Sequence, residues 1–356
     1  MGFIKKVLIL LIIIIFTYVL FRLLHRRSQL MKMSTKEGLN VFATPESELS
    51  SVQNSNPVLI QGIKREYTSR PICDYVIKSS YNSAITGNYV NLDMIKYLVK
   101  RGCRFLDFEV FYIDNSPQVA YTTDSKYETI DTDNHILLDT VLSTAVSNAF
   151  SSVSPNSGDP LFIHLRIKSG DPNIYKAVAK SVDFALKAKL HNKPVTKNTK
   201  LSEIMGKVVL IIDKTINREY KSLSSCSSKD TACYDLTKYK NMESGSETLF
   251  LQRYGELLNQ CAIPPHVLDN CPGQTKDICT NVSIMRLVLP DVNFKNAQNP
   301  DYNDFISNFG CQMLTYRFYS VDAGLKNYET FFDDNKLGIV PLAYAIRYIN
   351  DIKRTD

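Results

Sequence analysis

Two stretches decide the fold: Gly102-Cys103-Arg104-Phe105-Leu106-Asp107-Phe108-Glu109 and, far downstream, Gly310-Cys311-Gln312-Met313. Residues 92–101, directly before the first stretch, have the pattern of a helix, with Asn91 as its N-cap and Gly102 just past its end. The β-rich run 105–111 follows directly and indicates a strand. The stretch therefore predicts a helix that leads into a strand.

The same alternation of strand and helix continues along most of the chain. Val208-Val209-Leu210-Ile211-Ile212 is apolar throughout, as expected of a strand buried on both faces of a parallel sheet. Further strands are predicted at 75–78, 118–121 and 161–167 and a further helix at 173–190; the barrel is expected to resume at 284–290, continue through 309–316 and close with 342–350. Strands that alternate with helices over this length favour an α/β fold, a (β/α)8 TIM-like barrel.

Together with Ser79-Ser80-Tyr81-Asn82-Ser83, the two opening stretches resemble the X and Y halves of phosphatidylinositol-specific phospholipase C (PI-PLC). Weaker support comes from 160–167, from 205–210, and from Arg286 followed by Pro290. The segments occur in the family's order, and the similarity covers about residues 74–350. The resemblance implies a TIM-barrel phosphodiesterase that acts on phosphoinositides.

The family's reaction needs a base for the inositol 2-hydroxyl, positive charge beside the phosphorane and an acid for the leaving diacylglycerol. The resemblance implies that two histidines supply these groups, since imidazole has a pKa of about 6.5. Tyr81 and Tyr121 stand at those positions here. A phenol, with an ordinary pKa of about 10, is a poor proton acceptor at neutral pH. We therefore expect a pseudoenzyme.

The resemblance also implies a calcium site, of which Asn82, Asp107 and Glu109 are the remnant positions. The two carboxylates would lie two residues apart on one face of a strand. Arg166 stands at the fourth ligand position, where its charge would repel calcium, although bacterial members of the family also have an arginine there. We expect a buried ion-pair network of Asp107, Glu109 and Arg166. Calcium would be a cofactor only if the remnant site survives, and no other cofactor is expected.

Three basic residues, Arg166, Lys207 and Arg286, are the candidates for binding an inositol phosphate headgroup at the barrel mouth. His164 lies on the predicted strand 161–167 and has two interpretations. It is either a histidine satisfied within the core or a substitute catalyst in a divergent phosphoinositide phosphodiesterase. The leading hypothesis is a PI-PLC-like structural or interaction module. The alternative is a divergent phosphoinositide phosphodiesterase with non-histidine catalysts, or with Tyr81 or His164 in new roles.

An apolar run from Val7 to Leu24, flanked by Lys5-Lys6 and by His25-Arg26-Arg27, is long enough to cross a bilayer. No small-x-small cleavage site follows it, which favours an uncleaved anchor over a signal peptide. The excess of positive charge after the run predicts a single-pass protein whose large domain lies on the cytosolic face. The lipid bilayer is therefore the first expected partner.

The chain divides by composition into an anchor at 1–27, a polar tether at 28–66, an X-like half barrel at 67–214, a cysteine-containing insert at 215–281 and a Y-like half barrel at 282–356. The insert holds Cys226, Cys233, Cys261, Cys271 and Cys279. Their spacing does not match a zinc ribbon. Either they are free thiols, or they form disulfides in a secreted or surface hydrolase scaffold.

The net charge of +6 is mild and lacks the arginine and aromatic clusters of a nucleic-acid groove, so no nucleic-acid partner is expected. The lysines of 173–190 form either a solvated face or a membrane-docking patch. Richness in Lys, Asn, Ile and Tyr, together with the short anchor, points to a large DNA virus or an AT-rich microbe. In the viral case we expect a virion membrane protein with capsid or other virion proteins as partners.

Overall fold

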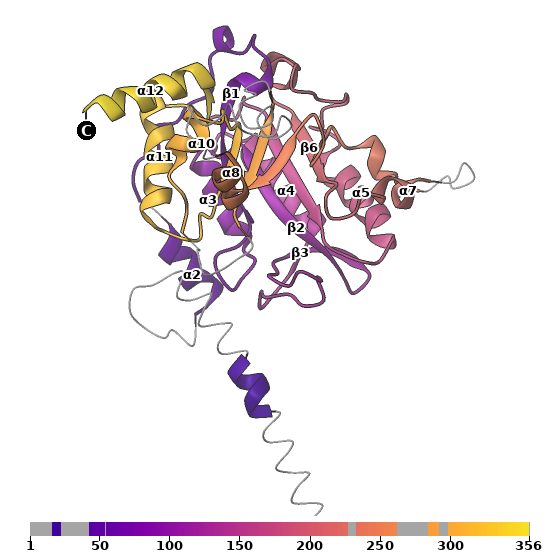
Figure 1. The fold of residues 1–356 in the computed structure, drawn as a ribbon. Helices are drawn as coiled ribbons and strands as arrows, with labels where there is room; N and C mark the ends of the chain where they lie inside the picture. Colours follow the sequence, from indigo (N-terminus) through magenta and orange to yellow (C-terminus); the bar gives the residue numbers. More distant parts are fainter. Residues whose placement is uncertain are drawn as a thin grey trace, which may run out of the picture.

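The computed structural model of the protein describes residues 16–22, 43–53, 55–226, 233–261, 284–291 and 298–355. Its centre is a barrel of parallel strands surrounded by helices (Figure 1). The barrel strands are β1 Tyr75–Ser80, β2 Phe105–Ile113, β5 Leu161–Ile167, β6 Val208–Asp213, β7 Met242–Ser244, β8 Phe250–Arg253, β9 Arg286–Leu289 and β10 Met313–Tyr316.

Neighbouring strands follow the order β7-β6-β5-β2-β1-β10-β9-β8, and each pair along it is parallel. No ladder joins β7 to β8 among the described strands, so the barrel is nearly, but not fully, closed. Antiparallel strands extend it: β3 Ser116–Ala120 pairs with β2 and with β4 Ile136–Leu137, and β11 Ile339–Pro341 pairs with β1. The predicted TIM-like α/β fold is confirmed.

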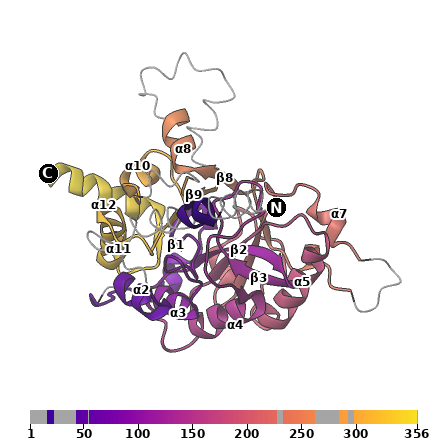
Figure 2. The ribbon, with the colours of Figure 1, turned by 90° about the horizontal axis from the view of Figure 1, so that it is seen from below.

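The helices pack around the outside of the barrel (Figures 1 and 2). They are α2 Pro45–Val52, α3 Leu92–Lys100, α4 Leu138–Ala149, α5 Asn173–Leu186, α6 Leu201–Ile204, α7 Tyr220–Ser224, α8 Tyr254–Cys261, α10 Tyr302–Ser307, α11 Ala323–Asn335 and α12 Leu342–Thr355. Short 3-10 turns lie at Arg65–Tyr67, Ile72–Asp74 and Leu236–Lys238. As predicted, Asn91 caps α3, its side chain accepting a hydrogen bond from the backbone N–H of Asp93.

The two Gly-Cys pairs share one structural role. Gly102 (φ +79°) and Gly310 (φ +58°) both follow a helix in the left-handed region that glycine adopts without strain. A Cβ on Gly102 would come within 2.7 Å of the Ile60 side chain, so the site also lacks room. Cys103 and Cys311 are fully buried, and burial raises the pKa of each thiol to about 12. The pairs therefore guide the chain from helix into strand at the N-terminal end of the barrel.

The last part of the predicted tether 28–66 packs on the barrel. Helix α2 is capped by Thr44, and the buried Glu48 carboxylate accepts hydrogen bonds from the Thr86 hydroxyl (3.0 Å) and the Asn88 side chain (2.8 Å). This contact is not evident from the sequence, because the residue that makes it is a glutamate, a residue type that is mostly exposed. The chain therefore joins the barrel beside the loop that follows β1.

The predicted insert 215–281 contains two strands of the barrel, β7 and β8, and helix α8. These strands are too short to leave a hydrophobic period in the sequence. Within it, Cys226 and Cys233 form a disulfide. Cys271 and Cys279 lie outside the described residues. Free thiols in the described part of the chain are Cys73, Cys103 and Cys311.

The anchor prediction for Val7–Leu24 lies largely outside the described residues. Its residues 16–22 are helical and exposed. None of the helices in the described ranges has both the length and the hydropathy of a bilayer span.

Candidate functional site

The candidate site lies where the strands β1, β2 and β5 end, at the C-terminal mouth of the barrel. Asp107 and Glu109 point from β2, and Arg166 from β5, and the register places Glu109 beside Arg166 and Asp107 beside His164. Asn82 follows β1 in the left-handed conformation (φ 45°), which turns the chain across the mouth. All of these side chains are buried.

Arg166 joins the group with all three of its guanidinium nitrogens. Nε donates to Asp107 Oδ1 (2.9 Å) and Nη2 to Asp107 Oδ2 (2.6 Å), a bidentate pair. Nη1 donates to Glu109 Oε1 (2.8 Å), and Nη2 also donates to Asn82 Oδ1 (2.7 Å). The ion-pair network predicted from the sequence is therefore confirmed.

Lys168 completes the charge balance, because its Nζ lies 2.8 Å from Glu109 Oε2. Two acids and two bases thus neutralise each other in a buried volume. Burial alone would raise the pKa of Asp107, but Arg166 and then His164 outweigh it and hold that pKa well below its usual range. Burial likewise opposes ionisation of Glu109, and Lys168 with Arg166 lowers its pKa. Each carboxylate remains charged at neutral pH.

Both ring nitrogens of His164 are engaged. Nδ1 lies 2.8 Å from Asp107 Oδ1 and Nε2 lies 2.8 Å from the Ser244 hydroxyl of β7. Because an ionised carboxylate only accepts, Nδ1 donates, which leaves Nε2 of a neutral ring to accept from Ser244. The side chain has no exposed surface. His164 therefore links β2 to β7 inside the barrel and presents no nitrogen to the mouth.

Above the network, the mouth is lined by tyrosines. The Arg166 guanidinium lies over the Tyr81 ring, 4.6 Å from its centroid. Three further buried tyrosines lie at the same end of the barrel: Tyr121 directly follows β3, Tyr254 directly follows β8, and Tyr319 lies three residues beyond β10. Burial first, then Tyr319 and Tyr81, raises the pKa of Tyr121 well above the usual value of a phenol. Tyr121 thus stays protonated at neutral pH and is a poor general base.

Sequence comparison connects this geometry with a known family. Residues 68–214 match the family model of the phosphatidylinositol-specific phospholipase C X domain. The chain is a PI-PLC-like barrel protein. No curated protein matches it by sequence.

Solved structures agree at the level of fold. PLC21 from S. officinalis has a TM-score of 0.59 at 15% identity, and the match covers 88% of this chain and 42% of that one. PLC21 from L. pealei has a TM-score of 0.58 at 14% identity, with 87% of this chain and 42% of that one covered. The PI-PLC-like barrel thus spans less than half the length of these two proteins.

The positions that resemble a calcium site are filled by the guanidinium of Arg166. The Asp107 and Glu109 oxygens that would face a metal already accept hydrogen bonds from Arg166, Lys168 and backbone N–H groups. In the described ranges no group of three or more His, Cys, Asp or Glu side chains is arranged to hold a metal ion. A divalent cation would have to displace a buried arginine, so these residues do not fit calcium.

The three basic candidates do not gather at one place. Arg166 lies near the mouth, but Lys207 precedes β6 and Arg286 is the first residue of β9, so both lie at the N-terminal end of the barrel. Arg286 is buried there and its Nη1 donates to the carbonyl of Phe309 (3.1 Å). The structure therefore does not bring Arg166, Lys207 and Arg286 together at the barrel mouth. The N-terminal face of such barrels carries stability rather than chemistry.

Sequence reasoning missed Lys168, Ser244, Arg317 and Tyr319 at the mouth. Arg317 follows β10 and its Nη2 donates to the carbonyl of Asp291 (2.9 Å). The Tyr319 hydroxyl is buried without a hydrogen-bond partner among the described residues. Lys168 could have been found, since it directly follows β5, two residues beyond Arg166, and the alternation of the strand continued by one residue puts it on the same side. Ser244 left no signal, because its strand is short.

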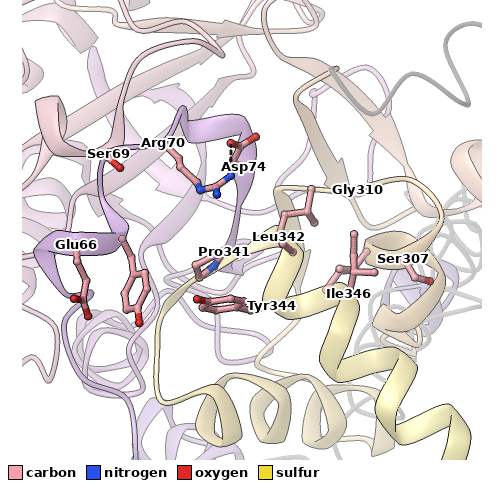
Figure 3. Close-up of a pocket in the computed structure, with 13 residues that line it drawn as sticks. Glu66, Ser69, Arg70, Asp74, Ser307, Gly310, Pro341, Leu342, Tyr344 and Ile346 are labelled. Atoms are coloured by element: carbon pink, nitrogen blue, oxygen red, sulfur yellow. Dashed lines mark ion pairs between the residues drawn. The ribbon is translucent and has the colours of Figure 1, made fainter.

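A separate cavity of about 580 Å³ opens at the other end of the barrel. Figure 3 shows it between the chain that enters β1 and the start of α12, with Leu342 and Ile346 on one wall. Arg70 and Asp74 form an exposed ion pair at its edge (3.9 Å). Gly310 of the second motif lines this cavity, but none of the candidate site residues at the mouth does.

Proposed function

We propose that the protein is a PI-PLC-like pseudoenzyme that acts as a structural or interaction module. One observation carries the proposal: the Arg166 guanidinium, held by Asp107, Glu109 and Asn82, fills the position where the family resemblance expects a metal. The tyrosines at the two proton-transfer positions add to it, because a buried phenol with a raised pKa neither accepts a proton nor supplies positive charge.

The alternative is a divergent phosphodiesterase that uses His164 in place of the missing histidines. Its support would be a histidine at the mouth, but both nitrogens of His164 are hydrogen-bonded and the side chain has no exposed surface. A general base must come within hydrogen-bond reach of the substrate proton. The alternative therefore requires His164 to leave two buried partners.

Residual affinity for an inositol phosphate headgroup belongs to the same proposal. Arg317 and the Tyr319 hydroxyl, rather than Lys207 and Arg286, are the groups at the mouth that would meet a phosphate. Arg317 lies close enough to Tyr319 to act on its pKa. A guanidinium beside a phenol suits a phosphate oxygen, because both groups donate hydrogen bonds.

The test is calcium-dependent hydrolysis of phosphatidylinositol and its phosphates by the full chain, in vesicles and in detergent. We expect no turnover above a protein-free control. The variant Tyr81→His/Tyr121→His, measured beside it, asks whether histidine loss alone silenced the barrel. Turnover only in this variant would support the pseudoenzyme with an open mouth. Turnover by the unmodified chain would overturn the proposal and favour the divergent enzyme.

We also propose that residues 7–24 hold the protein in a membrane as an uncleaved single-pass anchor, with the barrel on the cytosolic face. The charge pattern of the sequence supports this placement. Alkaline extraction of membranes should leave the full chain in the pellet and release a chain that lacks residues 1–27. If cells that express the full-length gene release the protein into the medium with a shortened N-terminus, the apolar run is a cleaved signal peptide instead. A virion role rests on composition alone and stays a prediction.

A further inference from the structure

The positive charge of this protein is concentrated in one stretch. Residues 172–200 contain seven lysines and a single acid, Asp183, a formal net charge of +6. The whole chain also has a net charge of +6, so the remainder is balanced. This stretch comprises α5 and the segment that runs from it to the entry of α6. The lysines therefore mark one side of the barrel.

The outer face of α5 combines three of these lysines with a phenylalanine. Lys176, Lys180, Phe184 and Lys187, which we call the α5 face, follow the three- and four-residue spacing of one helix side. All four are exposed, and the Phe184 side chain is 77% exposed. Both views of the fold show α5 on the outer wall of the barrel, beside α4 and α7 (Figures 1 and 2).

Little negative charge opposes the α5 face. Asp183 lies on the same side but is partly buried, where it pairs with Lys187 (3.3 Å) and accepts a hydrogen bond from the Tyr239 hydroxyl (2.9 Å). Helix α4, which packs against α5, carries one acid, Asp139, in its first turn. Beyond the helix, burial first and then Lys193 lower the pKa of His191, and Glu203 opposes the shift.

We propose that the α5 face docks on an anionic lipid bilayer. Lys176, Lys180 and Lys187 would lie against the headgroup phosphates, and the Phe184 ring would enter the interface between them. Basic side chains around an exposed aromatic residue form the usual surface of a helix that lies on a membrane. This contact would hold the barrel with its axis roughly parallel to the bilayer surface.

The composition of the α5 face favours a lipid bilayer over a purely solvated face or a nucleic-acid partner. A solvated face explains the lysines but not Phe184, because an exposed phenylalanine gains nothing from water. A nucleic-acid surface would be expected to contain arginine, and residues 172–200 contain none. Lysine, a compact point charge, suits headgroup phosphates without a fixed geometry. The anionic bilayer is the one partner that uses both the charge and the ring.

The test exploits a chain that contains no tryptophan. The full chain carrying Phe184→Trp has a single tryptophan on the α5 face, where substitution disturbs no packed core. Its emission is measured on vesicles of phosphatidylcholine alone and of phosphatidylcholine mixed with phosphatidylserine. We expect a shift to shorter wavelength, and quenching by brominated lipid, only on the mixed vesicles. High salt should remove both, because it screens surface charge.

Two matched variants make the result specific. Adding Lys176→Gln, Lys180→Gln and Lys187→Gln should raise the anionic lipid needed for the shift about 100-fold. Val321→Trp in the unmodified background, another exposed apolar site (62%), should show no salt-sensitive shift. Equal emission of Phe184→Trp on both vesicle types, a shift that survives the glutamine variant, or a shift with an oligonucleotide but not with lipid would each overturn the proposal.

Discussion

At the residue scale, the mouth of the barrel contains a network in which the buried Asp107 and Glu109 pair with the bases Arg166 and Lys168. Asp107, Glu109 and Arg166 could be predicted through the family resemblance, and the register places them on neighbouring strands. The hydrogen bond between His164 and Ser244 could not be predicted, because Ser244 lies on a strand that leaves no signal in the sequence. The folded-state pKa values of Asp107 and Glu109 are lowered. Their stabilisation is therefore present above about pH 4 and is lost as the pH falls further.

Replacing Arg166 by methionine should destabilise the fold by about 3–5 kcal/mol, because two buried carboxylates lose their common partner. The free energy of unfolding in urea measures this. Lys168→Met is the matched control: its side chain is 10% exposed and meets only Glu109 among these carboxylates. We expect a smaller loss there. Equal losses in the two variants would contradict the central place given to Arg166.

At the element scale, two contacts tie the N-terminal segments to the barrel, and neither could be predicted from the sequence. Glu48 of α2 is bound by Thr86 and Asn88, and the backbone N–H of Ile63 donates to Asp159 Oδ1 (3.0 Å) before β5. Both contacts bury an acid that a reading by composition places in solvent. The motif residues Arg104 and Gln312 also serve structure, since they hold loops at the N-terminal end of the barrel.

Asp159 should make stability depend on pH in the opposite sense from the mouth. Burial raises its pKa to about 6, although Arg104 opposes the shift. A carboxyl with a raised folded-state pKa stabilises the fold below its unfolded value of about 4, and this stability is lost as the pH rises through about 6. Asp159→Asn should therefore gain about 1–3 kcal/mol above pH 7 and little near pH 4. Urea unfolding at the two pH values measures this; an equal effect at both would contradict the account.

The Glu48 contact predicts how firmly α2 is held. Glu48→Ala removes the acceptor of hydrogen bonds from Thr86 and Asn88 and should speed amide hydrogen exchange across residues 45–52, with a loss of about 1–3 kcal/mol. Glu48→Gln keeps one carbonyl acceptor, so its amide exchange rate across residues 45–52 should lie between those of Glu48→Ala and the parent chain. Unchanged exchange in Glu48→Ala would show that α2 is held by other contacts.

At the scale of the whole molecule, the barrel itself could be predicted because residues 208–212 of β6 are apolar throughout and because strands alternate with helices of clear period. The two strands that nearly close the barrel could not be predicted, because β7 and β8 are only three and four residues long. The two ends of the barrel also differ in a way that a linear motif does not reveal. Arg286 matches a segment of the family, yet it begins its strand and lies at the end that supports the fold.

The most direct test of the account is the release of inositol phosphate from phosphatidylinositol vesicles by the unmodified full chain at stoichiometric concentration, with calcium and with a chelator. Stoichiometric protein detects a single slow turnover. The account predicts no release in either condition from a protein that unfolds cooperatively in the same preparation. Release that requires calcium, or that disappears in His164→Asn, would contradict the claim that the Arg166 network has replaced the chemistry of the barrel mouth.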